Sequence, residues 1–491
     1  MTLEQFKYLA KDYNLIPVYE IITADLLTPV MAYLKIRQSG KQSFLLESVE
    51  GSLSLARYSF LGVDPEKTIE NKKQNLFIKN GNHNESKTES IFNQLRTEIA
   101  GIKQAKLSEL PSFTGGIVGF LGYENIALIE NILEFDYPSI NKYDSSFGVY
   151  KTILAFDHYK HQIILITNVL LDDCSDLEKS FADAKKILLD LKTLLIKTEI
   201  KIDEFKVTDW LKNDFDRESF YSLVNKAKDE ITEGEIFQIV LSKRFSARFT
   251  GELFNVYRAL RMINPSPYMY YLEFEDSSTI IGTSPEDLLR VKNKKAQVLP
   301  IAGTRRRGKT EAEDKELEIN LMNDPKELAE HTMLVDLGRN DLGRVCKYGT
   351  VNVAELMKIQ KYSHVMHIVS KVEGEIADDK DSIDALKSCF PAGTVAGAPK
   401  IRAMQLIAAF ENEERNVYAG AVGYLDFSGD LDMCIAIRTL FSSGDVINWQ
   451  AGAGLVADSK PELEAKEIFN KAAVLVNALK YAEEINENFS N

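Results

Sequence analysis

Charged side chains are concentrated between Asp324 and Arg344, in the stretch DPKELAEHTMLVDLGRNDLGR. Asp324, the proline after it and Glu327 three positions later predict a helix that begins with a carboxylate cap and a capping box. We expect this helix to end near Gly338, to carry Glu330 one turn after its start, and to be followed by a charged loop. Such a segment positions carboxylates and guanidiniums for a ligand, unless it is a solvated helix with incidental charges.

Other segments also carry groups that could do chemistry. The glycine-rich loops 391–400 (PAGTVAGAPK) and 450–454 (QAGAG) expose backbone N–H groups that can bind anions, but neither has the spacing of a nucleotide phosphate loop. The arginines at 305–307 follow an apolar strand, where they either clamp carboxylates or coat a surface. His364 and His367 lie three residues apart in a strand-like segment, so their side chains point to opposite faces and at most one faces a site.

Both helices and strands are predicted to position these groups. Short strands separated by helices, with polar and glycine-bent edges, predict an α+β fold with large, partly antiparallel sheets packed as a sandwich and helices outside. The Asn80–Gly81 dipeptide predicts a hairpin turn, with a polar loop over 83–90. In the last predicted helix, 461–486, Glu464 and Glu467 lie opposite the apolar face, so periodicity predicts that both are solvated.

Length and composition limit the alternatives. A chain of 491 residues with 45% hydrophobic side chains builds one large core or two ordinary ones. The charged, weakly periodic stretch 197–217 predicts a boundary between an N-terminal region, 1–205, and a C-terminal region, 206–491. A net charge of −14 argues against nucleic acid or an anionic membrane as the main partner. The chain start lacks a signal-peptide pattern and no apolar run is long enough to span a bilayer, so we expect a cytoplasmic protein without membrane contact.

Six blocks, in order along the chain, resemble the signature segments of the chorismate-utilising enzymes and, among them, those of the anthranilate synthase component I branch. They are PIAGTRRRG (300–308), ELAEHTMLVDLGRNDLGR (327–344), HVMHIVSKVEGE (364–375), FPAGTVAGAPKIRAM (390–404), YAGAVGYLDFSGDLDMCIAIRT (418–439) and QAGAGLVADSKPELEAKE (450–467). The segments LLES (45–48) and NPSPYM (264–269) resemble the tryptophan-binding segments of that subunit. The resemblance covers essentially the whole chain and implies the fold of that family.

The resemblance implies a metal and a substrate. Glu330 and Glu467 match the two glutamates that hold one Mg²⁺, which would place Glu467 in a wet cleft despite the periodicity. Chorismate, a dicarboxylate, would be bound at the matching positions Gly303, Thr304, Tyr418, Arg438, Gly452, Ala453 and Gly454, with Gln238 and Lys400 nearby.

The resemblance also implies catalytic and regulatory residues. Glu286 matches the family's candidate general acid for the departing C4 hydroxyl, His367 matches the histidine tied to pyruvate elimination, and Thr394 is a further catalytic candidate. L-Tryptophan, the expected feedback inhibitor, would bind a pocket built from Leu45, Leu46, Glu47, Ser48, Pro267, Tyr268 and Met269.

Two positions separate branches of the family. Ala302 stands where aminodeoxychorismate synthases commonly carry a nucleophilic lysine, and Gln238 stands where isochorismate and salicylate synthases use a lysine to activate water. A site that lacks both of these lysines suits ammonia as the nucleophile. The sequence shows no glutamine-amidotransferase motif, so we expect a separate amidotransferase subunit, component II, to deliver ammonia within a hetero-oligomer.

The expected activity is therefore the Mg²⁺-dependent conversion of chorismate and ammonia to anthranilate and pyruvate, the first step of tryptophan biosynthesis. One alternative is aminodeoxychorismate synthase component I, which Ala302 opposes. Another is a non-catalytic tryptophan-sensing subunit, which the intact Glu286, Glu330, His367 and Glu467 oppose.

Overall fold

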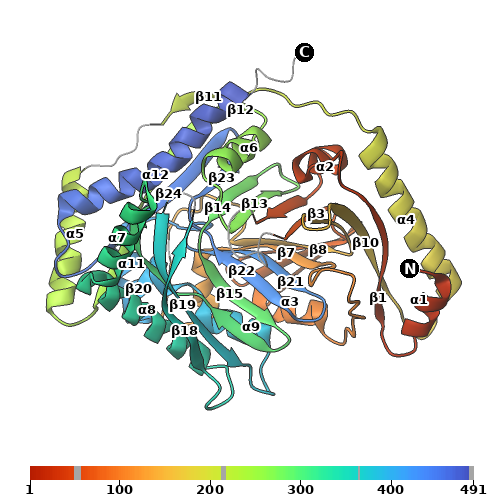
Figure 1. Cartoon of the computed structure of the whole chain (residues 1–491), viewed down its shortest axis with the longest axis horizontal. Helices are drawn as coiled ribbons and strands as arrows, with labels where there is room; N and C mark the ends of the chain where they lie inside the picture. Colours follow the sequence, from red (N-terminus) through yellow and green to blue (C-terminus); the bar gives the residue numbers. More distant parts are fainter. Residues whose placement is uncertain (49–56, 136, 212–216, 363–364, 486–491) are drawn as a thin grey trace.

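The computed structural model describes residues 1–48, 57–135, 137–211, 217–362 and 365–485. Within them two antiparallel sheets of 12 strands each form the centre of the molecule (Figure 1). The first sheet has the order β1-β10-β9-β3-β2-β13-β14-β23-β24-β12-β11, with β20 also paired to β12. Its strands are β1 (Leu15–Thr23), β2 (Ser43–Glu47), β3 (Tyr58–Val63), β9 (Thr152–Asp157), β10 (Gln162–Leu170), β11 (Phe205–Trp210), β12 (Gln238–Gly251), β13 (Tyr268–Glu273), β14 (Thr279–Ser284), β20 (Gly397–Ala398), β23 (Thr439–Ser443) and β24 (Val446–Leu455).

The second sheet has the order β17-β19-β16-β15-β22-β21-β7-β8-β4-β5-β6, with β18 also paired to β19. Its strands are β4 (Lys67–Lys72), β5 (Asn75–Asn80), β6 (His83–Thr88), β7 (Gly116–Leu121), β8 (Ser145–Tyr150), β15 (Asp287–Lys292), β16 (Lys295–Val298), β17 (Ile301–Arg306), β18 (Asn352–Lys361), β19 (Val365–Glu375), β21 (Ala421–Asp426) and β22 (Leu431–Ile435).

The sheets pack face to face because alternate strand residues on their inner faces are apolar. Phe44 and Phe60 from the first sheet share one buried cluster with Phe120 and Val422 from the second. This contact between two inner faces is the core of a sandwich. The α+β sandwich predicted from the sequence is confirmed.

Helices cover both outer faces. The first sheet is covered by α1 (Leu3–Leu9), α2 (Pro29–Ile36), α4 (Leu177–Lys197), α5 (Arg217–Thr232), α6 (Phe254–Ile263), α11 (Lys400–Glu411) and α12 (Pro461–Glu484), whose apolar residues form one cluster with it. The second is covered by α3 (Ile91–Ile99), the 3₁₀ turn η1 (Tyr123–Leu128), α8 (Pro325–Gly343), α9 (Ser382–Cys389) and α10 (Gly393–Ala396). A smaller cluster joins α7 (Glu311–Met322) to β19. Figure 1 shows α4 and α12 on opposite sides of the molecule.

Three local predictions were wrong. The helix expected to end near Gly338 continues to Gly343. Gly338 does not end the helix but allows close packing against the second sheet, since a Cβ there would lie 3.0 Å from Val298 Cγ2. Residues 83–88 form an exposed edge strand rather than a loop, because the main chain pairs with β5 whatever the side chains are. The arginines at 305–307 were expected to follow a strand, but the first two of them belong to strand β17.

The start of α8 is partly as predicted. Asp324 caps the helix by accepting hydrogen bonds from the backbone N–H groups of Lys326 and Glu327. The Glu327 carboxylate does not close a capping box, because it is held by Arg305, with 3.0 Å between Nη1 and Oε1.

The predicted boundary near residue 205 stays a prediction, and strands from both sides of it occur in both sheets. None of the described helices combines the length and the apolar character needed to cross a lipid bilayer.

Candidate active site

A cavity of about 660 Å³ lies between the first half of α8, α12 and the ends of strands from both sheets. Ten of the predicted metal, substrate and catalytic residues line it: Gln238, Glu286, Gly303, Thr304, Glu330, His367, Thr394, Arg438, Gly454 and Glu467. The fold therefore gathers residues from six separate sequence blocks around one space large enough for a small organic substrate.

Carboxylates dominate one wall of this cavity. Glu330 extends from α8, and Glu464 and Glu467 extend from α12. The pKa of Glu330 is raised, first by burial and then by the negative charges of Glu327 and Glu467. Mutual repulsion of this kind indicates excess negative charge, which a bound cation would offset.

The donor set on this wall fits Mg²⁺. Among the described residues no group of three or more His, Cys, Asp or Glu side chains is arranged to hold a metal ion. Mg²⁺, however, is usually held by only one or two protein carboxylates, with water and substrate oxygens completing its shell. Glu330 and Glu467 match that pattern, and Lys471 balances part of the charge through an ion pair of 2.8 Å with Glu467.

The prediction from periodicity that Glu464 and Glu467 are solvated agrees with Glu467, whose side chain is 47% exposed. Both residues also line the cavity, because the polar face of α12 borders it. Periodicity distinguishes polar from apolar surroundings and cannot tell a cavity from bulk water.

Glu286 provides a protonatable group beside this wall. It immediately precedes β15, and Thr394 Oγ1 donates a hydrogen bond to Glu286 Oε2 at 3.1 Å. Burial raises the pKa of Glu286, while this hydrogen bond and the charge of Arg438 act in the opposite direction. A buried carboxyl with a raised pKa is suited to donate a proton.

His367 provides a base. Its Nδ1 lies 3.0 Å from the backbone carbonyl oxygen of Gly303 and 3.1 Å from Thr304 Oγ1. Because a carbonyl oxygen can only accept, Nδ1 carries the proton in the contact with Gly303, and Nε2 keeps its lone pair. Burial lowers the pKa of His367, so the ring is neutral near pH 7. His364 lies outside the described residues.

Arg438 supplies a half-buried guanidinium to the site. Burial lowers its pKa and the charge of Glu286 raises it. Its φ of +49° lies in the left-handed region, which is costly for a residue with a Cβ and is concentrated at functional sites. The guanidinium is placed to meet a carboxylate of a ligand.

The structure does not place every candidate on the cavity wall. The Tyr418 hydroxyl packs against Gly452, where a Cβ would approach it to 2.5 Å, and Ala453 is buried in β24. Lys400 forms a buried ion pair with Asp341 of α8, with 2.8 Å between Nζ and Oδ2. These four residues lie outside the lining of the cavity.

Several lining residues were not predicted from the sequence to belong to this site. They include Asn264, Ser266, Lys326, Glu327, Tyr362 and Lys471. Lys471 follows Glu467 by one helical turn, a spacing that signals an ion pair and could have identified it.

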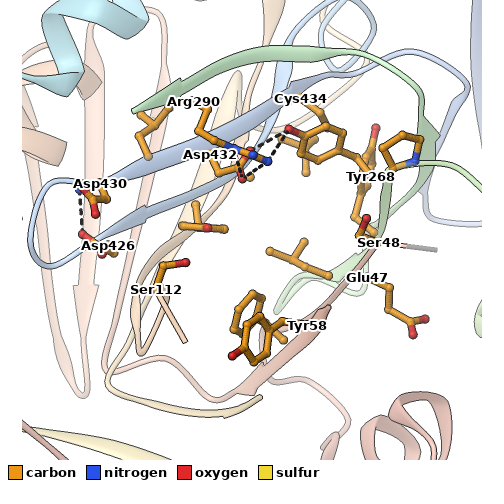
Figure 2. Close-up of a pocket in the computed structure, with 18 of the residues that line it drawn as sticks. Glu47, Ser48, Tyr58, Ser112, Tyr268, Arg290, Asp426, Asp430, Asp432 and Cys434 are labelled. Carbon is orange, nitrogen blue, oxygen red and sulfur yellow. Dashed lines mark hydrogen bonds and ion pairs between the residues drawn. The ribbon is translucent and has the colours of Figure 1, made fainter. Parts of the chain in front are cut away.

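A second cavity, of about 220 Å³, lies between the two sheets (Figure 2). It is lined by six of the seven residues predicted to bind tryptophan: Leu46, Glu47, Ser48, Pro267, Tyr268 and Met269. They adjoin because β2 pairs with β13, with Glu47 opposite Met269. Leu45 alternates to the other face of β2 and joins the core beneath the outer helices.

Polar groups of the second cavity come from both sheets. Tyr268 donates a hydrogen bond to Asp432 at 2.9 Å, and Arg290 pairs with the same carboxylate (Figure 2). Ser48 Oγ is buried and has no hydrogen-bond partner among the described residues. The Glu47 carboxylate is directed away from the cavity (Figure 2). It accepts a hydrogen bond from Tyr257 at 2.5 Å.

Comparisons with known proteins match these features. The model of the chorismate binding enzyme family matches residues 41–477. Anthranilate synthase component 1 of Acetivibrio thermocellus is 44% identical over 99% of each chain, and that of Aquifex aeolicus is 42% identical over 99% of each chain. The crystal structure of anthranilate synthase component I from Streptococcus pneumoniae TIGR4 is 38% identical, covers 92% of this chain and 98% of its own, and superposes with a TM-score of 0.74.

These comparisons confirm the resemblance and the fold predicted from the signature blocks. The family match spans strands of both sheets and every residue that lines the larger cavity. The chain therefore belongs to the chorismate-binding enzyme family.

Proposed function

We propose that the chain is anthranilate synthase component I and converts chorismate and ammonia to anthranilate and pyruvate in a Mg²⁺-dependent reaction, the first step of tryptophan biosynthesis. The observation that carries this proposal is that one cavity combines a carboxylate wall, a half-buried guanidinium, a protonatable carboxyl and a neutral imidazole. The relatives named above support it.

Binding would use both ends of the dicarboxylate substrate. Glu330 and Glu467 would hold Mg²⁺, which supplies Lewis-acid charge stabilisation at a substrate carboxylate when bound. Arg438 would pair with the other carboxylate, and the backbone around Gly303 and Gly454 lets the ligand approach closely.

The chemistry needs two proton transfers. Glu286, whose pKa is raised by burial, would give a proton to the departing C4 hydroxyl as ammonia adds to the ring. The product of this step still carries the enolpyruvyl group. His367 Nε2 would then remove a ring proton as the ring C–O bond to the enolpyruvyl group breaks. The ring becomes aromatic, and the enolate that leaves takes up a proton to become pyruvate.

The nucleophile would be ammonia because the cavity offers neither of the lysines that serve the other branches. Ala302 and Gln238 occupy those positions on its wall. An amide is a far weaker base than a desolvated lysine, so water is not activated at Gln238.

His367→Met should slow the second step more than the first. Proton transfer by a positioned side chain is worth about 10²–10⁴-fold, and methionine fills a similar volume without a base. The amino-substituted cyclohexadiene should accumulate, which chromatography of quenched reactions would detect. Equal loss of both steps, or of neither, would assign His367 a structural role.

The second cavity supports inhibition by L-tryptophan as a further part of the proposal. It is lined by aromatic and aliphatic as well as charged side chains, and it contains the Ser48 hydroxyl, which has no hydrogen-bond partner within the part of the chain that the structure describes. Pro267 lines both cavities, so the segment that would contact the inhibitor also shapes the active site. An inhibitor bound there must favour a less active state, because equal affinity for both states shifts nothing.

Ser48→Phe should weaken inhibition by tryptophan while the uninhibited rate stays close to normal, because a phenyl ring fills part of the second cavity and none of the first. The measurement is the tryptophan concentration that halves the rate. Ser59→Ala is a control on neighbouring strand β3, since Ser59 is buried but does not line the cavity. Unchanged tryptophan sensitivity in Ser48→Phe would refute the assignment.

The proposal includes a cytoplasmic hetero-oligomer in which component II supplies ammonia from glutamine. The test compares nitrogen donors on the purified chain. Ammonium salt should support anthranilate formation, and glutamine should not until component II is added. Glutamine-dependent turnover by the isolated chain would overturn the proposed division of labour.

A further inference from the structure

Arg415 lies in the loop after α11, and its guanidinium is almost completely buried behind the active-site cavity. Only 1% of the side chain is exposed, and its partner Glu411 at the end of α11 is exposed by 2%. The pair is bidentate, with 2.7 Å from Nε to Oε2 and 2.6 Å from Nη2 to Oε1. Burying an ion pair costs free energy of desolvation unless its remaining donors and acceptors are hydrogen-bonded. The other hydrogen bonds of this pair therefore show which parts of the chain it holds in place.

Those contacts are mainly with main-chain atoms of two elements that border the cavity, and the Ser242 hydroxyl also donates to Glu411 Oε1 at 2.8 Å. Arg415 Nη1 donates to the carbonyl oxygen of Val395 in α10, and Nη2 donates to that of Val240 in β12, both at 2.8 Å. Glu411 Oε1 accepts from the backbone N–H of Ser242 in β12 at 2.7 Å. The pair thus ties α10 and β12 to the end of α11 at fixed distances.

Each tied element carries a residue of the active site. Val395 directly follows Thr394, whose hydroxyl donates to Glu286. Val240 lies two residues after Gln238, so both have side chains on one face of β12. Gln238 lines the cavity.

The guanidinium also contacts aromatic rings. Its central carbon lies 4.8 Å from the ring centroid of Tyr123 and 5.6 Å from that of Tyr418. Cation–π contacts of this kind are strongest away from water. Tyr418, which does not line the cavity, is therefore fixed by the same side chain that holds α10.

We propose that Arg415, paired with Glu411, is a positioning residue for the reaction: it fixes Val395 and thereby places Thr394 against Glu286, without touching the substrate. This inference rests on the function proposed above. A misplacement of about 1 Å caused by a group remote from the chemistry can lower a rate about 10²-fold, which is the effect expected here.

Arg415→Lys is the first test, because lysine keeps the charge but cannot hold two carbonyl groups and a carboxylate in one plane. The kcat for ammonia-dependent anthranilate formation should fall on the order of 10²-fold, with a much smaller change in KM for chorismate. The matched control is Arg37→Lys, which breaks the bidentate pair of Arg37 with Glu252 outside the cavity lining. The control should keep wild-type kcat, and both proteins should keep the wild-type circular dichroism spectrum.

A double-mutant cycle separates positioning from general stability. If Arg415 acts through Thr394, Thr394→Val combined with Arg415→Lys should lower kcat no further than the larger single effect. Multiplied losses would overturn the proposal, and so would wild-type kcat in Arg415→Lys.

Should Arg415→Lys fail to fold, the combined variant Glu411→Gln with Arg415→Met removes both charges, leaves no unpaired ion and keeps an acceptor for Ser242. It should fold and show the same loss of kcat, and wild-type kcat in it would also overturn the proposal. A wild-type chain that forms no anthranilate would instead refute the proposed function itself.

Discussion

Replacing either Glu330 or Glu467 by glutamine should lower kcat on the order of 10³-fold, because each substitution removes a negative charge from the proposed metal-binding wall without changing its size. Charge stabilisation by a bound metal is worth several kcal/mol, and each 1.36 kcal/mol is tenfold in rate. Steady-state anthranilate fluorescence in the presence of ammonium salt measures the effect. Raising the Mg²⁺ concentration should restore activity only in part.

The matched control for these variants is Glu462→Gln. Glu462 stands on the same helix as Glu467, is exposed and does not line the cavity, so its loss should leave the rate and the Mg²⁺ dependence unchanged. Wild-type turnover in excess EDTA would contradict the metal assignment, as would full activity in either cavity variant.

The second large effect is expected for Glu286→Gln. The amide matches the carboxyl in shape and can still accept the hydrogen bond from Thr394, but it has no proton to donate. Loss of a positioned general acid should lower kcat by about 10²–10⁴-fold, with chorismate binding largely retained. Asp287→Asn is a less suitable comparison, because Asp287 accepts a backbone hydrogen bond from Leu299 that supports the fold.

The distinctive result for Glu286→Gln is that no amino intermediate should accumulate, in contrast to His367→Met, because the block precedes addition of ammonia. Accumulation of that intermediate in the glutamine variant would show that Glu286 acts in the later step.

Signature blocks made most of this site predictable. The resemblance identified ten lining residues, eight of them within the six blocks, while Gln238 and Glu286 lie outside the blocks. One of the eight is Glu467, which helical periodicity alone describes only as solvated. Periodicity could not place Glu467 at the cavity, because whether the polar face of α12 borders a cavity depends on how α8 and α12 pack and not on either helix alone. Packing between elements also explains Gly338. This glycine predicts a helix end from the sequence, but in the structure it allows close contact with Val298.

Tertiary partners account for the remaining differences. Lys400 lies in a glycine-rich block whose sequence suggests anion binding. Its ammonium group is instead paired with Asp341 of α8, which belongs to another block. Glu327 has the spacing of a capping-box residue and is drawn away by Arg305. Arg415 was not predicted, because nothing in ENEERNVYAG distinguishes a buried arginine from an exposed one.

The central claim is that this cavity joins ammonia to chorismate and expels pyruvate. The most direct measurement is product analysis by NMR and mass spectrometry after the purified chain is incubated with chorismate, Mg²⁺ and ammonium salt at alkaline pH. Anthranilate and pyruvate should appear in equal amounts, with no covalent adduct on the chain and little isochorismate or salicylate when ammonia is omitted. Formation of 4-amino-4-deoxychorismate, or of isochorismate as the main product, would contradict the account.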